Sequence, residues 1–458
     1  MPLHVTRREF LQTSAAAGAT AAAWSMTASS YARIMGSNAR LNVAYIGVGG
    51  IAGDQHIPKM EDFGCGCPCY CDADSNRWGN AADRWPDATG YTDYRDMYDN
   101  HHKEFDAVMV GTPDHHHYPA TIIAMMLGKH VYTQKPLTHT VWECRQLEAA
   151  MKKYKVATQM GNQGHALDKL RVTIDYIRGG AIGDLKEAHV WTDRPIWRQG
   201  QPRVEGSEAI PTNMNWDAWI GPAPLRPYRH NPADDWGGLY HPFNWRGFWD
   251  FGCGGMGDMA CHNLDPIYWA MLPGQPVSME LVDSEAINGA DQYQSEGTVR
   301  YHFAADGDRP AFDMYWYEGG RKPERPAELA GDEPLPNQGG YYIGTRGKMI
   351  ALGDSREAPI LLPQSAHEAY GTPRQQIERS EGHHKEWFLA CTGQKPYDYP
   401  KSNFAYAAPF TEMILLGCIA QQVGGKLYYD AASGQFTNSD LANSFITKTY
   451  RRGWDFKM

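Results

Sequence analysis

The sequence lacks an excess of basic charge. Asp and Glu together number 53 against 43 for Lys and Arg, which gives a formal net charge of -10. Proteins that bind nucleic acid or an anionic membrane surface present basic patches to the phosphates. We therefore expect no nucleic-acid partner.

Long apolar runs are also scarce. The Ala-rich stretch at 14–26 is shorter than the roughly 20 residues that a membrane span needs. It follows Arg7 and Arg8 and precedes the small-residue site at 30–32, an order that is typical of a twin-arginine export signal. The sequence predicts a signal peptide at 1–32, a periplasmic or otherwise exported protein and no stable membrane insertion.

Cysteine is present in an odd number, nine, and four of these residues alternate at Cys65, Cys67, Cys69 and Cys71. A structural zinc site takes its thiolates from separated pairs, whereas alternate residues of a strand all lie on one face. We therefore expect small side chains packed on a buried strand, not a metal or redox site. Three consecutive histidines at 115–117 cannot all face one ion in a regular element, so we predict no metal there either.

The chain has enough length and apolar content for two domains, with 458 residues of which 42% are hydrophobic. From residue 41 the pattern repeats strand, turn and helix, with strands at 41–46, 70–73, 105–110, 130–133 and 156–160 and helices at 118–127 and 141–154. This repeat is typical of an α/β fold with a doubly wound parallel sheet. Residues 38–160 are predicted to form a Rossmann domain that binds NAD or NADP.

The pattern changes after residue 161. A helix is predicted at 169–177 and alternating strands at 186–191, 297–303 and 311–317, as in half-exposed antiparallel sheets. We expect residues 161–458 to form an α+β domain with an open, mostly antiparallel sheet. This domain would bind the substrate and join the protein into a homo-oligomer, a dimer or a tetramer.

A glycine-rich turn follows the first predicted strand. Its sequence at 47–52 fits G-x-G-x-x-A: Gly47 permits a tight turn, and Gly49 lets the backbone approach a pyrophosphate at a helix N-terminus. Asp72 ends the second strand, where a carboxylate accepts the ribose hydroxyls of NAD and repels a 2'-phosphate. Arg77 carries a positive charge close to Asp72 in the sequence, which weakens the preference for NAD, so NADP remains an alternative cofactor.

Further motifs resemble those of the Gfo/Idh/MocA oxidoreductases, a family that includes glucose-fructose oxidoreductase and inositol dehydrogenase. They are C-D-x-D-x-x-R at 71–77, T-P-x-x-x-H at 112–117, a tripeptide that ends in Lys135-Pro136, and G-G-x-x-D-x-x-x-H-x-x-D at 254–265. The tripeptide begins with Gln134, where the family usually has glutamate. The resemblance implies that the cofactor is held by Gly47, Gly49, Gly50, Ile51, Asp72, Arg77, Thr112, Pro113, His117, Gln134, Lys135 and Asn162.

The same resemblance implies a catalytic centre of Lys135, Asp258 and His262, which would also contact the substrate. Asp258 and His262 are four residues apart, so on a helix they share one face. Oxidation of a secondary alcohol needs a base for the hydroxyl proton and a donor that holds the developing alkoxide. We assign the base to His262 and the holding group to Lys135, while Asp258 orients the substrate.

A carbohydrate substrate is suggested by tryptophans that cluster between residues 191 and 269, because aromatic faces suit the C–H faces of sugars. Asp193 and Arg194 follow the alternating strand and are further candidates for substrate binding. His383 and His384 are expected at a helix start, and they could also edge the substrate cleft.

Export limits the supply of free nicotinamide, so we expect NAD, or NADP, to be tightly bound. The sequence therefore predicts an NAD(P)-dependent sugar or polyol oxidoreductase. The alternative is an NAD-dependent glycosidase that oxidises its sugar transiently. Members of that related family generally lack the lysine tripeptide and the D-x-x-x-H run, which favours the dehydrogenase.

Overall fold

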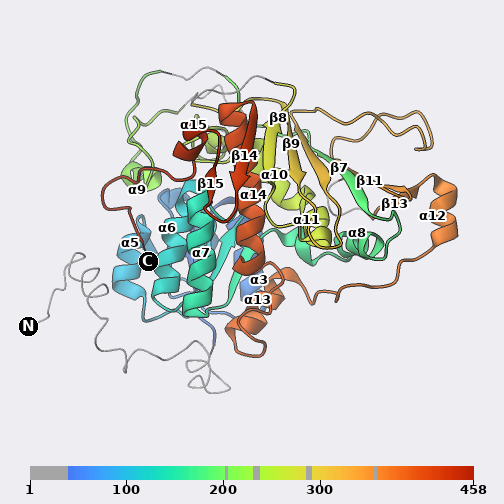
Figure 1. Cartoon of the computed structure of the whole chain (residues 1–458). Coiled ribbons are helices and arrows are strands. Elements are labelled where there is room, and N and C mark those ends of the chain that lie inside the picture. The colour runs from blue at the N-terminus through green and yellow to red at the C-terminus, as the bar shows by residue number, and fades with distance from the viewer. Residues whose placement is uncertain (1–39, 202–204, 231–237, 285–290, 354–357, 458) are drawn as a thin grey trace, which may run out of the picture.

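The computed structural model describes residues 40–457 except 202–204, 231–237, 285–290 and 354–357. It contains two sheets with helices packed around them (Figure 1). The predicted signal peptide at 1–32 lies outside the described residues.

The first sheet has six parallel strands in the order β3-β2-β1-β4-β5-β6. This is the doubly wound sheet predicted from the sequence, although the edge strand β3 was not predicted. Its short, half-exposed sequence, Thr-Gly-Tyr, carries little strand pattern. The strands are β1 (Val43–Ile46), β2 (Cys69–Cys71), β3 (Thr89–Tyr91), β4 (Ala107–Val110), β5 (His130–Gln134) and β6 (Thr158–Gly161).

Helices cover both faces of this sheet because its strands are buried on both sides. One face packs on α5 (Tyr94–His101), α6 (His117–Met126) and α7 (Val141–Tyr154). The other packs on α3 (Ile57–Asp62), α4 (Gly79–Ala82) and α13 (His383–Cys391). Helix α13 comes from late in the chain, so the two halves of the sequence are interleaved around the first sheet.

The second sheet has nine strands in the order β13-β12-β11-β7-β10-β9-β8-β14-β15. Only the β7–β10 pair is parallel, so the mostly antiparallel sheet predicted for this half is confirmed. Its strands are β7 (Leu185–Trp191), β8 (Ser278–Leu281), β9 (Gly297–Phe303), β10 (Phe312–Glu318), β11 (Gly339–Gly344), β12 (Lys348–Leu352), β13 (Ile360–Leu362), β14 (Lys426–Asp430) and β15 (Gln435–Phe436).

One face of the second sheet packs on helices, and burial alternates along β10 as the sequence pattern predicts. The helices are α8 (Asp168–Arg178), α10 (Gly254–Asn263), α11 (Asp265–Met271) and α14 (Phe404–Val423), with α9 (Trp216–Ile220), α12 (Gln364–Tyr370) and α15 (Asp440–Ser444) further out. Helix α14 is apolar and long enough to cross a membrane, but 83% of its apolar window is buried between the two sheets, as in the core helix of a globular protein.

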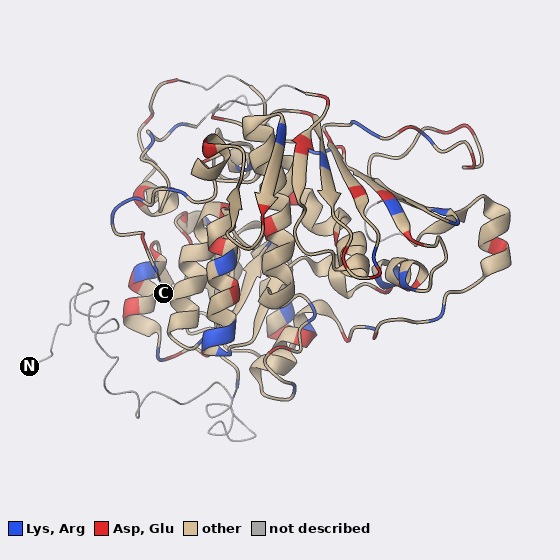
Figure 2. Cartoon of the chain, in the orientation of Figure 1, with Lys and Arg blue, Asp and Glu red and all other residues tan. Residues whose placement is uncertain are grey.

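Charged residues of both signs are interspersed over the elements in Figure 2, and no continuous basic stripe is visible on the face shown. The alternating cysteines are only partly on a strand. Cys69 and Cys71 lie on β2, whereas Cys65 and Cys67 belong to the loop before it, and all four are buried free thiols. Among the described residues no group of His, Cys, Asp or Glu is arranged to hold a metal.

The C-terminal segment 445–457 returns to the first sheet. Trp454 is 1% exposed and lies under the guanidinium of Arg95 at 3.7 Å, on α5. The hydroxyl of Tyr118, on α6, donates to the carbonyl of Phe456 at 3.1 Å. Figure 1 accordingly shows the chain end beside α5.

Candidate active site

A cleft of about 650 Å³ lies where the strands of the first sheet end. The chain order of that sheet reverses between β1 and β4, and the cleft opens at this point, where open parallel sheets bind ligands. It is lined by most of the residues predicted to bind cofactor or substrate: Gly47, Gly49, Gly50, Ile51, Asp72, Arg77, Thr112, Pro113, Gln134, Lys135, Arg194, Asp258 and His262.

The glycine turn forms the floor of one end of the cleft. Gly47 has φ +79°, and a Cβ there would lie 2.7 Å from the backbone of Gly111, so only glycine fits. A Cβ on Gly49 would meet the Arg77 side chain at 3.2 Å. The turn thus offers bare backbone to a ligand at the start of a helical segment, with a cation beside it, which fits a dinucleotide pyrophosphate.

Asp72 lies beside this turn. Its two carboxylate oxygens accept from the backbone N–H groups of Val48 and Asp74, both at 3.0 Å. Burial raises the pKa of Asp72 although these two hydrogen bonds lower it. Arg77 pairs with Asp74 at 3.6 Å. The carboxylate of Asp72 is therefore fixed at the end of β2, at the place expected for a ribose contact.

Lys135 and Asp258 meet at the other end of the cleft. Lys135 follows β5 directly, and its ammonium donates to Oδ1 of Asp258 at 2.5 Å and to the Asp258 carbonyl at 2.8 Å. Arg246 Nε lies 3.4 Å from the same Oδ1. Burial would raise the pKa of Asp258, but the charges of Lys135 and Arg246 outweigh it and hold the pKa below its usual value. Asp258 therefore stays ionised.

Helix α10 carries Asp258 and His262, which both line the cleft as their spacing predicted. The N-terminal end of this helix is held by Asp114, whose Oδ2 accepts from the N–H of Cys253 at 3.0 Å. Burial raises the pKa of Asp114 to about 7 despite the nearby charges of Arg246 and Lys135. Asp114 thus joins the turn after β4 to the helix that carries the predicted catalytic pair.

The three consecutive histidines hold this region together through backbone carbonyls. The ring nitrogens of His115 lie 3.2 and 3.1 Å from the carbonyls of Phe251 and Trp219, and His116 Nε2 is 2.8 Å from the latter. The Nδ1 of His117 lies 2.6 Å from the carbonyl of Pro136 and its Nε2 lies 3.0 Å from that of Thr112, and as a neutral ring it donates to one of the two. Burial lowers the pKa of His116 to about 3 and that of His117 to about 4, so these rings are neutral.

Gln134 connects Lys135 to a chain of histidines. The N–H of Lys135 donates to Gln134 Oε1 at 3.1 Å, so the amide NH₂ must face His56 Nε2, which lies 2.5 Å away. His56 Nδ1 then donates to His384 Nε2 at 2.8 Å. Burial, and after it the charge of Lys59, lowers the pKa of His384 to about 4. The pair at 383–384 begins α13, as predicted, but it lies beside Tyr132 and not among the residues that line the cleft.

Three predicted site residues lie outside the cleft lining. Asn162 is buried and donates to Asp265 Oδ2 at 3.2 Å. His117 contacts the backbone carbonyls of Pro136 and Thr112. Asp193 accepts from Asn337 at 3.2 Å on the loop side. In the described chain, these three residues are therefore placed to support the site and not to line it.

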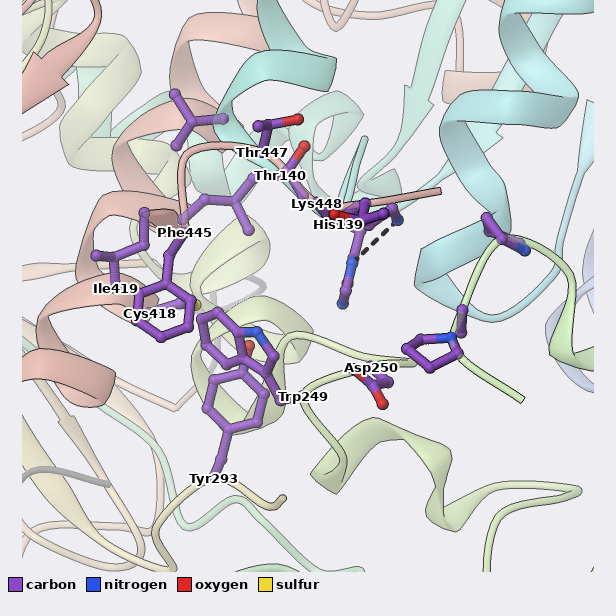
Figure 3. Close-up of a pocket in the computed structure, with 16 residues that line it drawn as sticks. His139, Thr140, Trp249, Asp250, Tyr293, Cys418, Ile419, Phe445, Thr447 and Lys448 are labelled. Atoms are coloured by element: carbon purple, nitrogen blue, oxygen red, sulfur yellow. Dashed lines mark hydrogen bonds between the residues drawn. The ribbon is translucent and has the colours of Figure 1, made fainter. Parts of the chain in front are cut away.

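A second cavity, of about 170 Å³, is lined by residues other than Lys135 and the glycine turn, and Figure 3 shows its lining side chains. Its aromatic wall is formed by Trp249, Tyr293 and Phe445. Lys448 in this cavity is held by His139 Nδ1 and Glu143 Oε1, both at 3.1 Å. Its ammonium is thus already compensated, and the cavity contains no residue of the predicted catalytic set.

Two family models match the chain. Residues 41–162 match the oxidoreductase family's NAD-binding Rossmann fold and residues 187–307 its C-terminal alpha/beta domain, together more than half of the chain. The chain belongs to the Gfo/Idh/MocA family.

Relatives of this family member are distant. A glycosyl hydrolase family 109 protein of Shewanella putrefaciens is 27% identical over 208 residues, which is 40% of this chain and 44% of that protein. The chain thus spans less than half the length of the curated relatives that it matches first.

Solved structures share the fold over most of their length. The WlbA dehydrogenase from Bordetella pertussis, in complex with NADH and UDP-GlcNAcA, has a TM-score of 0.56 at 14% identity over 86% of this chain and 99% of that one. Levoglucosan dehydrogenase, in complex with NADH and levoglucosan, has a TM-score of 0.51 at 18% identity over 87% and 99% of the two chains. At these identities the likeness shows the Gfo/Idh/MocA fold alone.

Sequence reasoning did not identify Asp114, Arg246, His56 or His241 as site residues of this family member. Asp114 immediately follows Thr112-Pro113, so its place in the turn was a usable signal. Arg246 was visible only as one polar residue among tryptophans, because its partner Asp258 is fixed by tertiary packing. His241 lines the cleft and pairs with Asp74 at 2.9 Å, a contact that no spacing rule predicts.

Proposed function

We propose that the protein is a nicotinamide-dependent oxidoreductase that converts a secondary alcohol of a sugar or polyol to the ketone, and the reverse. The observation that carries this proposal is the Lys135–Asp258 pair with His262, which lines the same cleft as a glycine turn fitted to a dinucleotide. The dehydrogenases that share the fold, in complexes with NADH and sugars, support it.

Bound at the glycine turn, the nicotinamide cofactor supplies the acceptor for the two electrons of the alcohol. The chain's own residues handle the proton. The Lys135 ammonium has three N–H groups and gives two to Asp258, so one remains for the substrate oxygen. Asp258, held ionised, keeps Lys135 in place and is a poor proton acceptor.

His262 is assigned the base because a neutral imidazole can accept the hydroxyl proton of the substrate. It lies one helical turn beyond Asp258 on α10 and lines the cleft. In the oxidising direction the O–H proton passes to His262 while Lys135 stabilises the oxygen. In the reducing direction His262 returns the proton.

NAD is proposed as the preferred cofactor because the Asp72 carboxylate, fixed beside the turn, would repel a 2'-phosphate. We further propose that the cofactor stays bound between turnovers and that residues 1–32 direct export. The open face of the second sheet, where His189 stacks on Tyr315 and Tyr341, is the proposed oligomer interface.

A second candidate, an NAD-dependent glycosidase, is supported by the similarity to glycosyl hydrolase family 109 proteins. Such an enzyme takes two electrons from its sugar and returns them, so it yields free sugar without net reduction of the cofactor. The same Lys135, Asp258 and His262 would serve its oxidation step.

One assay tests both candidates. NAD-loaded protein is mixed with a panel of sugars, polyols and aryl glycosides, and the absorbance of reduced nicotinamide is followed. The masses of the products are determined by mass spectrometry. The oxidoreductase gives cofactor reduction and a product two hydrogens lighter. Glycoside cleavage without net reduction would identify the glycosidase, and no response to any compound would contradict both proposals.

A further inference from the structure

The reaction end of the cleft carries more positive than negative charge. Lys135, Arg194 and Arg246 line it together with Asp114 and Asp258. A single oxygen, Asp258 Oδ1, accepts from Lys135 at 2.5 Å and from Arg246 at 3.4 Å. One carboxylate is thus shared by two cations, and Arg194 is not part of this network.

Arg194 lacks an acceptor among the residues that the structure describes. Its Nε is buried without a hydrogen-bond partner, and no ion pair joins its guanidinium to a described carboxylate. A buried N–H without a partner has lost its hydration for no return, unless a ligand supplies the missing acceptor. Arg194, which follows β7, therefore presents an unsatisfied N–H donor at the wall of the cleft.

The backbone fixes Arg194 beside the predicted catalytic helix. Its carbonyl accepts from the N–H of Gly319 at 2.7 Å. The same oxygen lies 3.4 Å from the place of a Cβ on Gly255, in the first turn of α10. Asp258 follows Gly255 by three residues and so shares its face of the helix. Arg194 and Asp258 thus belong to one wall of the site.

Asp114 does not remove the excess of positive charge. Its Oδ2 is engaged by the N–H of Cys253 at 3.0 Å, and burial raises its pKa to about 7, which favours the uncharged form. An oxidised nicotinamide ring would add a further positive charge at this end. With the cofactor bound, this end of the cleft would therefore carry more positive charge than Asp258 alone can balance.

We propose that the natural substrate is an acidic sugar, whose anionic group is held by Arg194 and Arg246 while Lys135 holds the reacting hydroxyl. The proposal rests on the oxidoreductase function above. Guanidinium groups bind carboxylate or phosphate through paired hydrogen bonds. Arg246 is kept in place by the rings of Phe243 and Trp245, each 4.2 Å from its guanidinium. Both residues line the cleft, where aromatic rings suit the C–H face of a sugar.

The test compares substrates that share a hexose ring and differ in the charge of the group at carbon 6. NAD-loaded protein is assayed with a hexuronate, a hexose 6-phosphate and the neutral hexose, and kcat/KM is measured for each. We expect at least one anionic sugar to exceed the neutral one by about 10- to 100-fold, the effect of one charge-assisted contact. Whichever of the two acids is preferred identifies the anion as carboxylate or phosphate.

Arg194→Gln should lower the ratio of acidic to neutral kcat/KM by about 10-fold or more, and Arg194→Lys by less. The matched control, Arg300→Gln, removes one positive charge from β9 outside the cleft and should leave the ratio unchanged. Titration of the NADH-loaded protein with the same sugars reports binding of each without oxidation, because the reduced cofactor cannot accept a hydride. Oxidation of neutral sugars at equal or higher kcat/KM would overturn the inference of an acidic substrate but would still agree with the proposed oxidoreductase function. If no sugar is oxidised, the proposed function itself is contradicted.

Discussion

Lys135 and Asp258 hold each other in their charged forms at the reaction end of the cleft. A buried carboxylate alone would take up a proton, but two cations within 3.4 Å prevent it. Asp258 consequently acts through its charge, and the proton of the reaction must pass to another group. His262 is that group in the proposed mechanism.

Replacement of the proposed catalytic residues should separate these roles. Lys135→Met should keep the bound cofactor but lose most of kcat, because the substrate oxygen loses its donor. His262→Asn should lower kcat by about 100- to 10,000-fold and flatten the acidic limb of the pH profile. The double variant should be little worse than the poorer single one, since both act in one transition state. Near-normal rates in either single variant would contradict the assignment.

Asp72 should set the cofactor preference. Asp72→Ala removes the acceptor for the ribose and the charge that repels a 2'-phosphate, so the affinity for NAD should fall by more than that for NADP. One charge-assisted hydrogen bond corresponds to about 1.5–3 kcal/mol. Fluorescence titration of cofactor-free protein with both cofactors measures this difference, and equal losses would show that Asp72 does not distinguish them.

Gln134, the departure from the family's usual glutamate, gives a prediction about His56. In the wild type, His56 Nε2 accepts from the Gln134 amide and the ring is neutral, with its pKa lowered by burial and by His384. Gln134→Glu would face Nε2 with a carboxylate and should raise the pKa of His56. The nitrogen chemical shifts of labelled histidine report its protonation, and Gln364→Glu on the exposed helix α12 is the matched control. An unchanged His56 ring in Gln134→Glu would mean that the amide does not set its protonation.

At the scale of single elements, α10 depends on a buried acid from another part of the fold. Asp114 lies in the turn after β4, and its carboxylate holds the N–H that precedes the first residue of α10. A helix N-terminus favours a negative charge, but burial opposes it, and the raised pKa shows that burial dominates. The position of the proposed base is therefore coupled to an acid that titrates near neutral pH.

This coupling predicts the pH dependence of stability. The pKa of Asp114 is about 7 in the folded state against 3.8 for an ordinary aspartate, so the folded state binds more protons between these values. The contribution of Asp114 to stability therefore falls as pH rises through them. Asp114→Asn should raise the free energy of unfolding at pH 8 by as much as about 4 kcal/mol, and by almost nothing at pH 4. Urea unfolding at the two pH values measures the difference. Asp54 is an exposed acid beside the same cleft, and Asp54→Asn is the control. It should change the free energy of unfolding by no more than about 0.5 kcal/mol at either pH.

Elements with a strong local pattern were predictable from the sequence. Helix α7 and strand β9 have the predicted bounds. A capping box at Thr140 and Glu143 marks the start of α7, and the alternation of apolar and polar residues defines β9. Strand β3 and helix α9 have no such pattern. The glycine turn and the spacing of Asp258 and His262 are local as well, whereas Arg246 and His56 enter the site through contacts 12 and 78 residues away along the chain. Such pairings follow from packing and not from spacing.

At the scale of the whole molecule, the two halves of the sequence share the first sheet. Helix α13 covers one face, and segment 445–457 covers α5 and α6 on the other. Trp454 also meets the ring of His116, which lines the cofactor cleft, at 5.5 Å between centroids. The C-terminal segment therefore supports the cleft without lining it.

Removal of this support should be costly. Trp454→Ala should lower the free energy of unfolding by about 3–5 kcal/mol, because a fully buried indole is replaced by a cavity. It should also weaken cofactor binding through His116. Urea unfolding and cofactor titration measure the two effects. Leu441→Ala, at a half-exposed position on α15, is the control and should cost less than about 1 kcal/mol.

The contact between Tyr118 and Phe456 joins residues 338 positions apart. During synthesis the first sheet emerges long before either α13 or the C-terminal segment, so apolar faces of α3, α5 and α6 stay uncovered until the last part of the chain has been made. The full packing of the nucleotide-binding half therefore requires the last residues of the chain. With the export proposed for residues 1–32, cofactor binding and a complete chain would both come before transport.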